Sequence, residues 1–219
     1  MSVVARVPLG GWYPSHVMMG DDELVRGWKA GDRTAAERLI ERHYDAITGF
    51  FRTKAGASAD DLVQRTFLRC AEGIGNYREE SPFRAYLFGI ARHVLLEHIR
   101  GRARDGQTPD LHTSSIMDLQ PGVATLVSKH AEQRLLVAAL QRIPVELQIA
   151  IELFYWEELP IDELALVLEV PAGTVKSRLH RARVLLREAM DALPSSHEDK
   201  ESLRSKLASW LSEVREELA

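Results

Sequence analysis

The sequence predicts an all-α protein, and three observations support that prediction. Apolar residues recur at spacings near 3.6 over most of the 219-residue chain, strand-like alternation is nowhere sustained, and Gly, Pro and Ser separate the helical stretches. The composition, 45% hydrophobic and 27% charged, is that of an ordinary globular protein. We therefore expect two small helical domains joined by a flexible linker, followed by a C-terminal amphipathic helix.

The first half is expected to hold a flexible leader (1–19), punctuated by Gly and Pro, and a helical domain (20–104). Asp21-Asp22 can cap its first helix, and Ser81-Pro82 supply an N-cap serine and a first-turn proline to its last one. Four helices are predicted, running from Asp21 to Ala30, from Asp32 to Gly56, from Asp60 to about Gly73 and from Ser81 to Arg104.

A linker is predicted at 105–128, where helical periodicity is absent and Asp-Gly, Thr-Pro, Ser-Ser and Pro-Gly pairs occur. Fully extended, it would span up to ~80 Å at about 3.3–3.6 Å per residue, enough for the two halves to contact distant sites of one large partner. Helical sequence resumes in a second domain (129–193). New helices start at Pro144 and Pro160, and a tight turn follows at 171–174.

The last 26 residues, 194–219, form a separate segment. Ser195 and Glu198 fit a capping box, and the residues that follow place one apolar stripe on an otherwise charged helix. The stripe consists of Leu203, Leu207, Trp210, Leu211, Val214 and Leu218. A stripe of this kind needs another surface to cover it.

Several classes of protein are excluded by what the sequence lacks. Cys70 is the single cysteine, which rules out an internal disulfide and is more typical of a small buried hydrophobe than of a thiol sensor. No histidine pair stands at i, i+3 or i+4, and no P-loop, G-x-S-x-G, H-E-x-x-H or dinucleotide loop occurs. The longest stretch near the start without Lys, Arg, Asp or Glu contains two prolines, so it is too broken to span a membrane. We expect a soluble cytoplasmic protein with no catalytic residues, no metal and no cofactor.

Charge changes sign abruptly in the second domain, although the net charge of the chain is only −4. Residues 144–170 contain seven acids and no Lys or Arg, whereas 172–187 contain five bases and no acid. One interpretation is a basic helix that forms salt bridges with an acidic neighbour. The other is a helix-turn-helix whose second helix enters the DNA major groove. The apolar residues favour the latter, because they step by 4, 3 and 4 and leave the basic side open. They are Val175, Leu179, Ala182 and Leu186.

A second cationic cluster ends the fourth predicted helix. It consists of Arg92, Arg100, Arg102 and Arg104, with the single acid Glu97 inside it. Two interpretations remain open, since arginines favour helix C-termini through the helix dipole and also bind phosphate.

Two segments resemble a known family. ADDLVQRTFLRCAEGIGNYREESPFRAYLFGIARHVLLEHIRGRAR resembles the second conserved region of bacterial RNA polymerase sigma factors, and LPIDELALVLEVPAGTVKSRLHRARVLLREAM resembles the fourth. The layout is similar to that of the extracytoplasmic-function (ECF, group IV) class, and the resemblance covers about 21–104 and 129–192. It implies an alternative sigma factor that binds core RNA polymerase, reads −35 duplex DNA and captures the melted −10 element.

The resemblance also implies which residues make each contact. For the β′ clamp helices of the core they are Asp61, Leu62, Gln64, Arg65, Phe67, Leu68 and Arg69. For the −10 element they are Asn76, Tyr77, Arg78, Arg84, Tyr86, Arg92, His93 and Arg100. For the −35 element they are Thr174, Lys176, Ser177, Arg178, His180, Arg181 and Arg183. The β flap of the polymerase and an anti-sigma factor are further expected partners. Phe67, Leu68 and Tyr86 are also compatible with core positions.

The sequence departs from the family pattern at four positions. Arg65 stands where an acid is common, Tyr86 where Trp is frequent and His93 where Asn is frequent, which affects the β′ contact and the −10 preference. Glu169 replaces the usual Gly before Val-Pro, so the turn either tolerates a side chain or bends differently.

Two alternative functions remain at this point. A stand-alone helix-turn-helix regulator would bind duplex DNA without polymerase, and an adaptor would use the third helix and the tail for protein contacts only. Two hypotheses likewise apply to the tail. It restrains one of the two DNA-binding domains until core polymerase binds, or it caps and stabilises the second domain.

Overall fold

A computed structural model describes residues 19–102, 110–119 and 131–194, together with 198, 200–202 and 204–205; for 131–133 it gives the backbone only. These residues are helical, without a β-strand, which confirms the predicted all-α class. Their α-helices are α1 (Asp21–Lys29), α2 (Arg33–Ala55), α3 (Ala59–Gly73), α4 (Phe83–Arg102), α5 (Ile116–Leu119), α6 (Ala131–Leu140), α7 (Val145–Tyr155), α8 (Ile161–Leu168) and α9 (Ala172–Ala192). Two 3₁₀ turns, Gly56–Ser58 and Ile74–Asn76, flank α3.

Helices α1 to α4 form an N-terminal bundle. The Asp32 carboxylate caps α2 by accepting hydrogen bonds from the backbone N–H groups of Thr34 (2.8 Å) and Ala35 (3.2 Å). Helix α2 ends at Gly56, where φ is +54°, a value that glycine adopts without strain. Successive helices of the bundle pack against one another and bury the apolar faces expected from the periodicity.

Helices α6 to α9 form a C-terminal bundle in which α8 and α9 are the predicted helix-turn-helix. The turn between them passes through Glu169 in the left-handed conformation (φ 55°, ψ 42°). The N–H of Val170 closes the end of α8 on the carbonyl of Ala165 (3.1 Å). The turn therefore tolerates a side chain at the position where glycine is usual.

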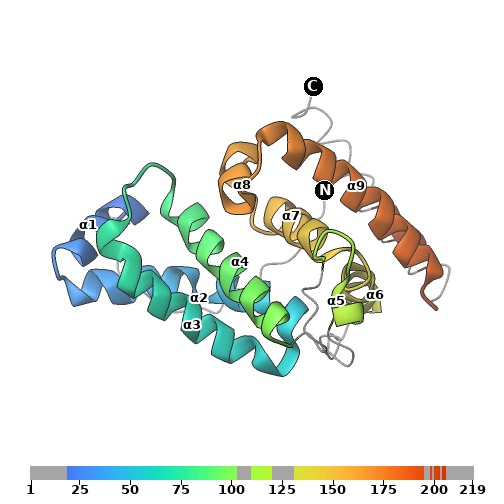
Figure 1. Ribbon diagram of the computed structural model, residues 1–219, viewed down its shortest axis with the longest axis horizontal. Coiled ribbons are helices and arrows are strands. Elements are labelled where there is room, and N and C mark those ends of the chain that lie inside the picture. Colours follow the sequence, from blue (N-terminus) through green and yellow to red (C-terminus); the bar gives the residue numbers. More distant parts are fainter. Residues whose placement is uncertain are drawn as a thin grey trace.

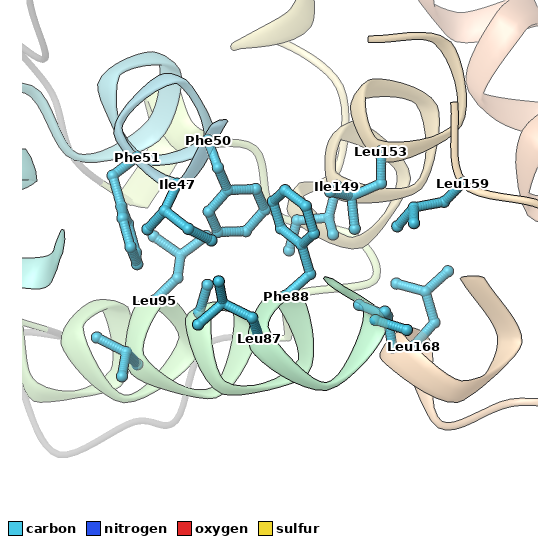
Figure 2. Close-up of a cluster of buried hydrophobic side chains, with 14 of the residues drawn as sticks. Ile47, Phe50, Phe51, Leu87, Phe88, Leu95, Ile149, Leu153, Leu159 and Leu168 are labelled. Carbon is cyan, nitrogen blue, oxygen red and sulfur yellow. The ribbon is translucent and has the colours of Figure 1, made fainter. Parts of the chain in front are cut away.

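The two bundles share one hydrophobic core. Helix α4 lies between the rest of its own bundle and the C-terminal bundle, where it packs on α8 (Figure 1). Leu87 and Phe88 of α4 lie in a buried cluster with side chains from α2, α7 and α8 (Figure 2). The labelled members are Ile47, Phe50, Phe51, Leu87, Phe88, Leu95, Ile149, Leu153, Leu159 and Leu168. A second cluster, around Leu140, Ile151 and Leu186, belongs to the C-terminal bundle alone.

Part of the predicted linker lies on this assembly. Leu111 and Ile116 are buried in the shared core, and the helix α5 follows Ser115. Backbone hydrogen bonds join Val145 to Ser114 (3.1 Å) and Met117 to Gln141 (3.1 Å). The sequence did not predict α5, because this segment lacks helical periodicity. The rest of the linker, the leader 1–18 and the apolar stripe of the tail lie outside the described residues.

Candidate nucleic-acid interface

The first half of α9 presents a polar face to solvent. Lys176, Ser177, His180 and Arg181 are all exposed. The opposite face is buried at the four positions that the 4, 3, 4 spacing indicated, and this confirms the predicted orientation of the helix. Side chains at the start of such a helix are placed to reach base edges in a major groove.

The other three −35 candidates, on the same helix, are partly engaged. Arg178 is half-buried and donates a hydrogen bond to Glu146 Oε2 (3.3 Å). Arg183 donates to the carbonyl of Leu179 (3.2 Å), and the Thr174 carbonyl accepts a hydrogen bond from Ser177 Oγ (2.9 Å). Arg178 therefore joins α9 to α7, whereas the contacts of Arg183 and Thr174 lie within α9 itself. All three are less exposed than the four side chains of the polar face.

The loop before α4 is fastened to α1. Lys29 Nζ donates to the carbonyl of Tyr77 (2.5 Å) and pairs with Glu79 (2.6 Å), whose φ is +59°. Tyr77 is buried, stacks on Tyr86 with ring centroids 4.6 Å apart, and donates its hydroxyl to the carbonyl of Ser81. Burial raises the pKa of Tyr77 to about 12.

Of the loop candidates for the −10 element, Asn76 and Arg78 are exposed, with Arg78 near Glu80 at 3.9 Å. The sequence left Tyr86 open between stacking on a base and packing in the core, and it assigned Tyr77 to the −10 element. In this conformation they stack on each other. A base could stack on either ring only after a rearrangement of the loop.

Three of the −10 candidates on α4, Arg84, Arg92 and His93, contact acids of the C-terminal bundle. Arg84 binds the carbonyl and the carboxylate of Glu157, the latter at 2.9 Å. Arg100, in the last turn of α4, is exposed. Arg92 is only 8% exposed and pairs with Glu146 (2.8 Å), and His93 contacts Glu169 (3.0 Å). The salt-bridge interpretation of the acidic stretch is thus correct in part, although the principal cationic partners lie on α4.

The proposed polymerase-contacting face of α3 combines exposed and buried residues. Leu68 is 55% exposed, and Phe67 stacks on the exposed Tyr44 of α2 with ring centroids 6.1 Å apart. Asp61 and Gln64 are also exposed. Tyr44 was not predicted from sequence; the signal available was an aromatic residue outside the apolar stripe of its helix.

Three polymerase candidates on α3 have other roles in this conformation. Arg69 binds both oxygens of Glu97 (2.9 and 2.7 Å), and Arg65 lies 3.7 Å from the same carboxylate. The Arg69 guanidinium lowers the pKa of Glu97. Leu62 is fully buried, so it supports the helix from inside the bundle and does not reach a partner.

Other kinds of site are not found in the described part of the chain. No group of three or more His, Cys, Asp or Glu side chains there is arranged to hold a metal ion. No described helix is long and apolar enough to cross a membrane. Cys70 is buried, and burial raises the pKa of its thiol to about 12, which makes it a poor nucleophile.

An all-α fold with a polar helix exposed in a helix-turn-helix is typical of DNA-binding proteins. Two family models match the chain: sigma-70 region 2 over residues 39–105 and sigma-70 region 4 over 133–186. The ECF RNA polymerase sigma factor SigM of Mycobacterium tuberculosis is 31% identical over 168 residues, which cover 76% of this chain and 82% of SigM. The RNA polymerase sigma-H factor of Pseudomonas aeruginosa is 27% identical over 184 residues, covering 79% and 95%.

Solved structures show the same fold. CnrH, in complex with the cytosolic domain of CnrY, superposes with a TM-score of 0.61 at 23% identity, covering 80% of this chain and 99% of CnrH. RpoE of Bartonella quintana, in complex with the anti-sigma factor NepR, gives 0.55 at 23% identity, covering 72% and 98%. The chain belongs to the ECF family of RNA polymerase sigma factors. It is an alternative sigma factor that directs promoter-specific transcription, and its family is not known as enzymatic.

Proposed function

We propose that this sigma factor reads the −35 duplex with the exposed face of α9 and captures the −10 strand with the 74–82 loop and α4. Core polymerase binds Leu68, Phe67 and Tyr44. The observation that carries the −35 assignment is the exposed polar face of α9. Side chains that project from the start of a recognition helix can discriminate bases, each good contact being worth about 1–3 kcal/mol. The protein acts in the cytoplasm and has no catalytic role of its own.

An anti-sigma factor is a further proposed partner. Support comes from the B. quintana neighbour, whose structure contains one, and from the exposed apolar side chains of this chain. Nothing in the structure or in the comparisons favours a stand-alone regulator.

The test of the −35 assignment is transcription by core polymerase with this protein on a library of genomic DNA. We expect discrete, protein-dependent start sites that share a −35 and a −10 sequence. The double variant His180→Ala/Arg181→Ala should lose these transcripts while it still binds core polymerase. Arg187→Ala is the matched control, because Arg187 is an exposed arginine further along α9. Equal transcript loss in the control, or unaltered transcription by the double variant, would refute the assignment.

A further inference from the structure

The first turns of the tail fold back against the end of α9. The described tail residues, 198, 200–202 and 204–205, are helical. Lys200 Nζ donates a hydrogen bond to the backbone carbonyl of Asp191 (2.9 Å), and Arg204 Nη2 donates to the carboxylate of the same residue (2.5 Å). Asp191 stands in the last turn of α9. The tail therefore does not lead away from the C-terminal bundle but begins on the surface of its longest helix.

These two contacts define which side of the tail faces α9. Lys200 and Arg204 are four residues apart, so they lie on one side of a helix. Leu207 follows Lys200 by seven residues, and Leu211 and Leu218 follow Arg204 by seven and fourteen. A spacing of seven keeps side chains on one side of a helix, as in a coiled coil. These leucines lie outside the described residues, and their spacing places the predicted apolar stripe on the side that meets α9.

Asp191 lies on the same side of α9 as part of the proposed −35 face. Val184 and Ser177 precede it by seven and fourteen residues, and His180 precedes it by eleven. All three are exposed, and Val184 is an apolar side chain with 43% of its surface open. We call these four positions the outer line of α9. An apolar residue in the middle of a polar line is a place where a second helix can pack.

The contact between Arg204 and Asp191 also sets a register. When two helices run antiparallel, each step forward along one meets a step back along the other. Leu211, seven residues after Arg204, then lies opposite Val184, seven residues before Asp191. Residues 205–218 of the tail span about 21 Å as a helix at 1.5 Å per residue, the same length as 177–190 of α9. The tail is therefore long enough to reach the first turns of α9.

We propose that in the free protein the tail packs antiparallel on the outer line of α9, with Leu211 over Val184, and covers His180 and Ser177. This inference rests on the proposed function of α9. A helix with its side chains is about 10–12 Å wide, and the DNA major groove, about 12 Å wide, admits only one. The docked tail thus keeps α9 out of the groove, and reading of the −35 duplex requires its release.

The cover is a steric block and does not bury the cationic side chains of α9. Lys176 and Arg181 lie to either side of the outer line, so they stay open to solvent while the tail is docked. Release of the tail exposes Ser177 and His180 between them. The apolar stripe of the tail accordingly regulates DNA binding.

The position of the tail is tested by disulfide formation in the full chain. The test variant, Val184→Cys/Leu211→Cys, places two thiols opposite each other in the proposed register. The control, Val184→Cys/Ser209→Cys, places the second thiol two residues earlier, on the other side of the tail helix. The natural Cys70 is buried and does not take part. Under mild oxidation, mass spectrometry should find an intramolecular disulfide in most test molecules and in few control molecules. Equal yields, or no disulfide in the test variant, would overturn the docking.

The block is tested by binding of a randomised duplex DNA pool to the free protein. Leu207→Ser/Leu211→Ser weakens the apolar contact, and Ser209→Ala/Ser212→Ala is the control on the polar side of the tail. We expect duplex binding about tenfold tighter in the first variant and unchanged in the control. A surface that is free in one molecule in ten binds about tenfold more weakly than one that is always free. Adding His180→Ala/Arg181→Ala to the first variant should remove the gain, and a gain that persists would mean that the tail covers a surface other than α9.

Failure of the block and failure of the proposed function give different results. A disulfide without tighter duplex binding in the leucine variant overturns the block. Transcription by core polymerase then distinguishes the two cases. If the wild type produces start sites that share a −35 sequence, the proposed function stands and only the block is wrong. If neither the wild type nor the leucine variant produces such start sites, the proposed function has failed with it.

Discussion

The proposed −35 face of α9 and the proposed −10 face of α4 are both built from cationic and polar side chains on a long helix, yet their surroundings differ. On α9, Lys176 and Arg181 project into solvent. On α4, Arg92 is 8% exposed and lies against Glu146. Residue type and helical position indicate what a side chain can bind. Tertiary packing decides whether it is free to do so.

The largest effect is expected at the buried ion pair between Lys54 of α2 and Glu152 of α7. Glu152→Ala leaves Lys54 fully buried without its carboxylate partner, which should lower the free energy of unfolding by about 3–5 kcal/mol. Chemical denaturation measures this change. The double variant Lys54→Met/Glu152→Leu removes both charges and should recover most of the loss. If the single variant is as stable as the wild type, the two bundles do not depend on this contact.

Two arginine truncations compare the faces directly. Arg92→Ala should lower the free energy of unfolding by about 2 kcal/mol, since Glu146 stays buried with Arg178 as its remaining partner. Arg181→Ala removes an exposed side chain and should change stability by less than about 0.5 kcal/mol. The pair is measured in one denaturant series. Equal losses in the two variants would mean that the faces are equally exposed.

The strained turn gives a smaller effect of opposite sign. Glu169→Gly relieves a left-handed backbone but removes a solvent-exposed ion pair, so we expect a gain of at most about 1 kcal/mol in the free energy of unfolding. Glu158, with φ 51°, has the same strain without a described contact to α4, which makes Glu158→Gly the control. The stability difference between the two variants measures the contacts of Glu169 with His93 and Arg92 together. If Glu169→Gly clearly lowers the free energy of unfolding and Glu158→Gly does not, the contact of Glu169 with α4 is stronger than the exposure of Glu169 suggests.

The smallest effect concerns acid stability within the N-terminal bundle. Hydrogen bonds from His43 (2.8 Å) and Arg42 (2.6 Å) lower the pKa of Asp21. A carboxyl whose folded pKa is lowered stabilises the protein above its unfolded pKa, and this contribution is lost as the pH falls through the folded pKa. Thermal unfolding between about pH 5 and pH 2 should therefore show a steeper loss for the wild type than for Asp21→Asn. Parallel curves would exclude this contribution.

The helices themselves could be predicted from sequence, because local chemistry determines where they begin and which face is buried. Asp32 caps α2 and Ser81-Pro82 precede α4, and the 4, 3, 4 spacing identified the buried side of α9. The exposed −35 candidates follow from that periodicity. For the turn, sequence left open whether Glu169 bends the chain differently, and only the backbone angles show that it adopts the conformation expected of glycine.

The packing of the two bundles could not be predicted in the same way. An apolar stripe shows that Leu87 and Phe88 need cover, but it does not identify the Ile149 and Leu153 side chains that provide it. The charge pattern showed seven acids beside five bases in sequence, whereas three of the acids pair with α4, more than fifty residues away. Long-range pairing of this kind leaves no periodic signal.

The most direct test of the difference between the two faces is arginine footprinting with phenylglyoxal, read by mass spectrometry. The free protein is modified in the absence of DNA. Arg181 should react rapidly, because it is exposed, and Arg92 should be protected by its burial against Glu146. If Arg92 reacts as fast as Arg181, the two faces are equally exposed and the contrast between them is wrong.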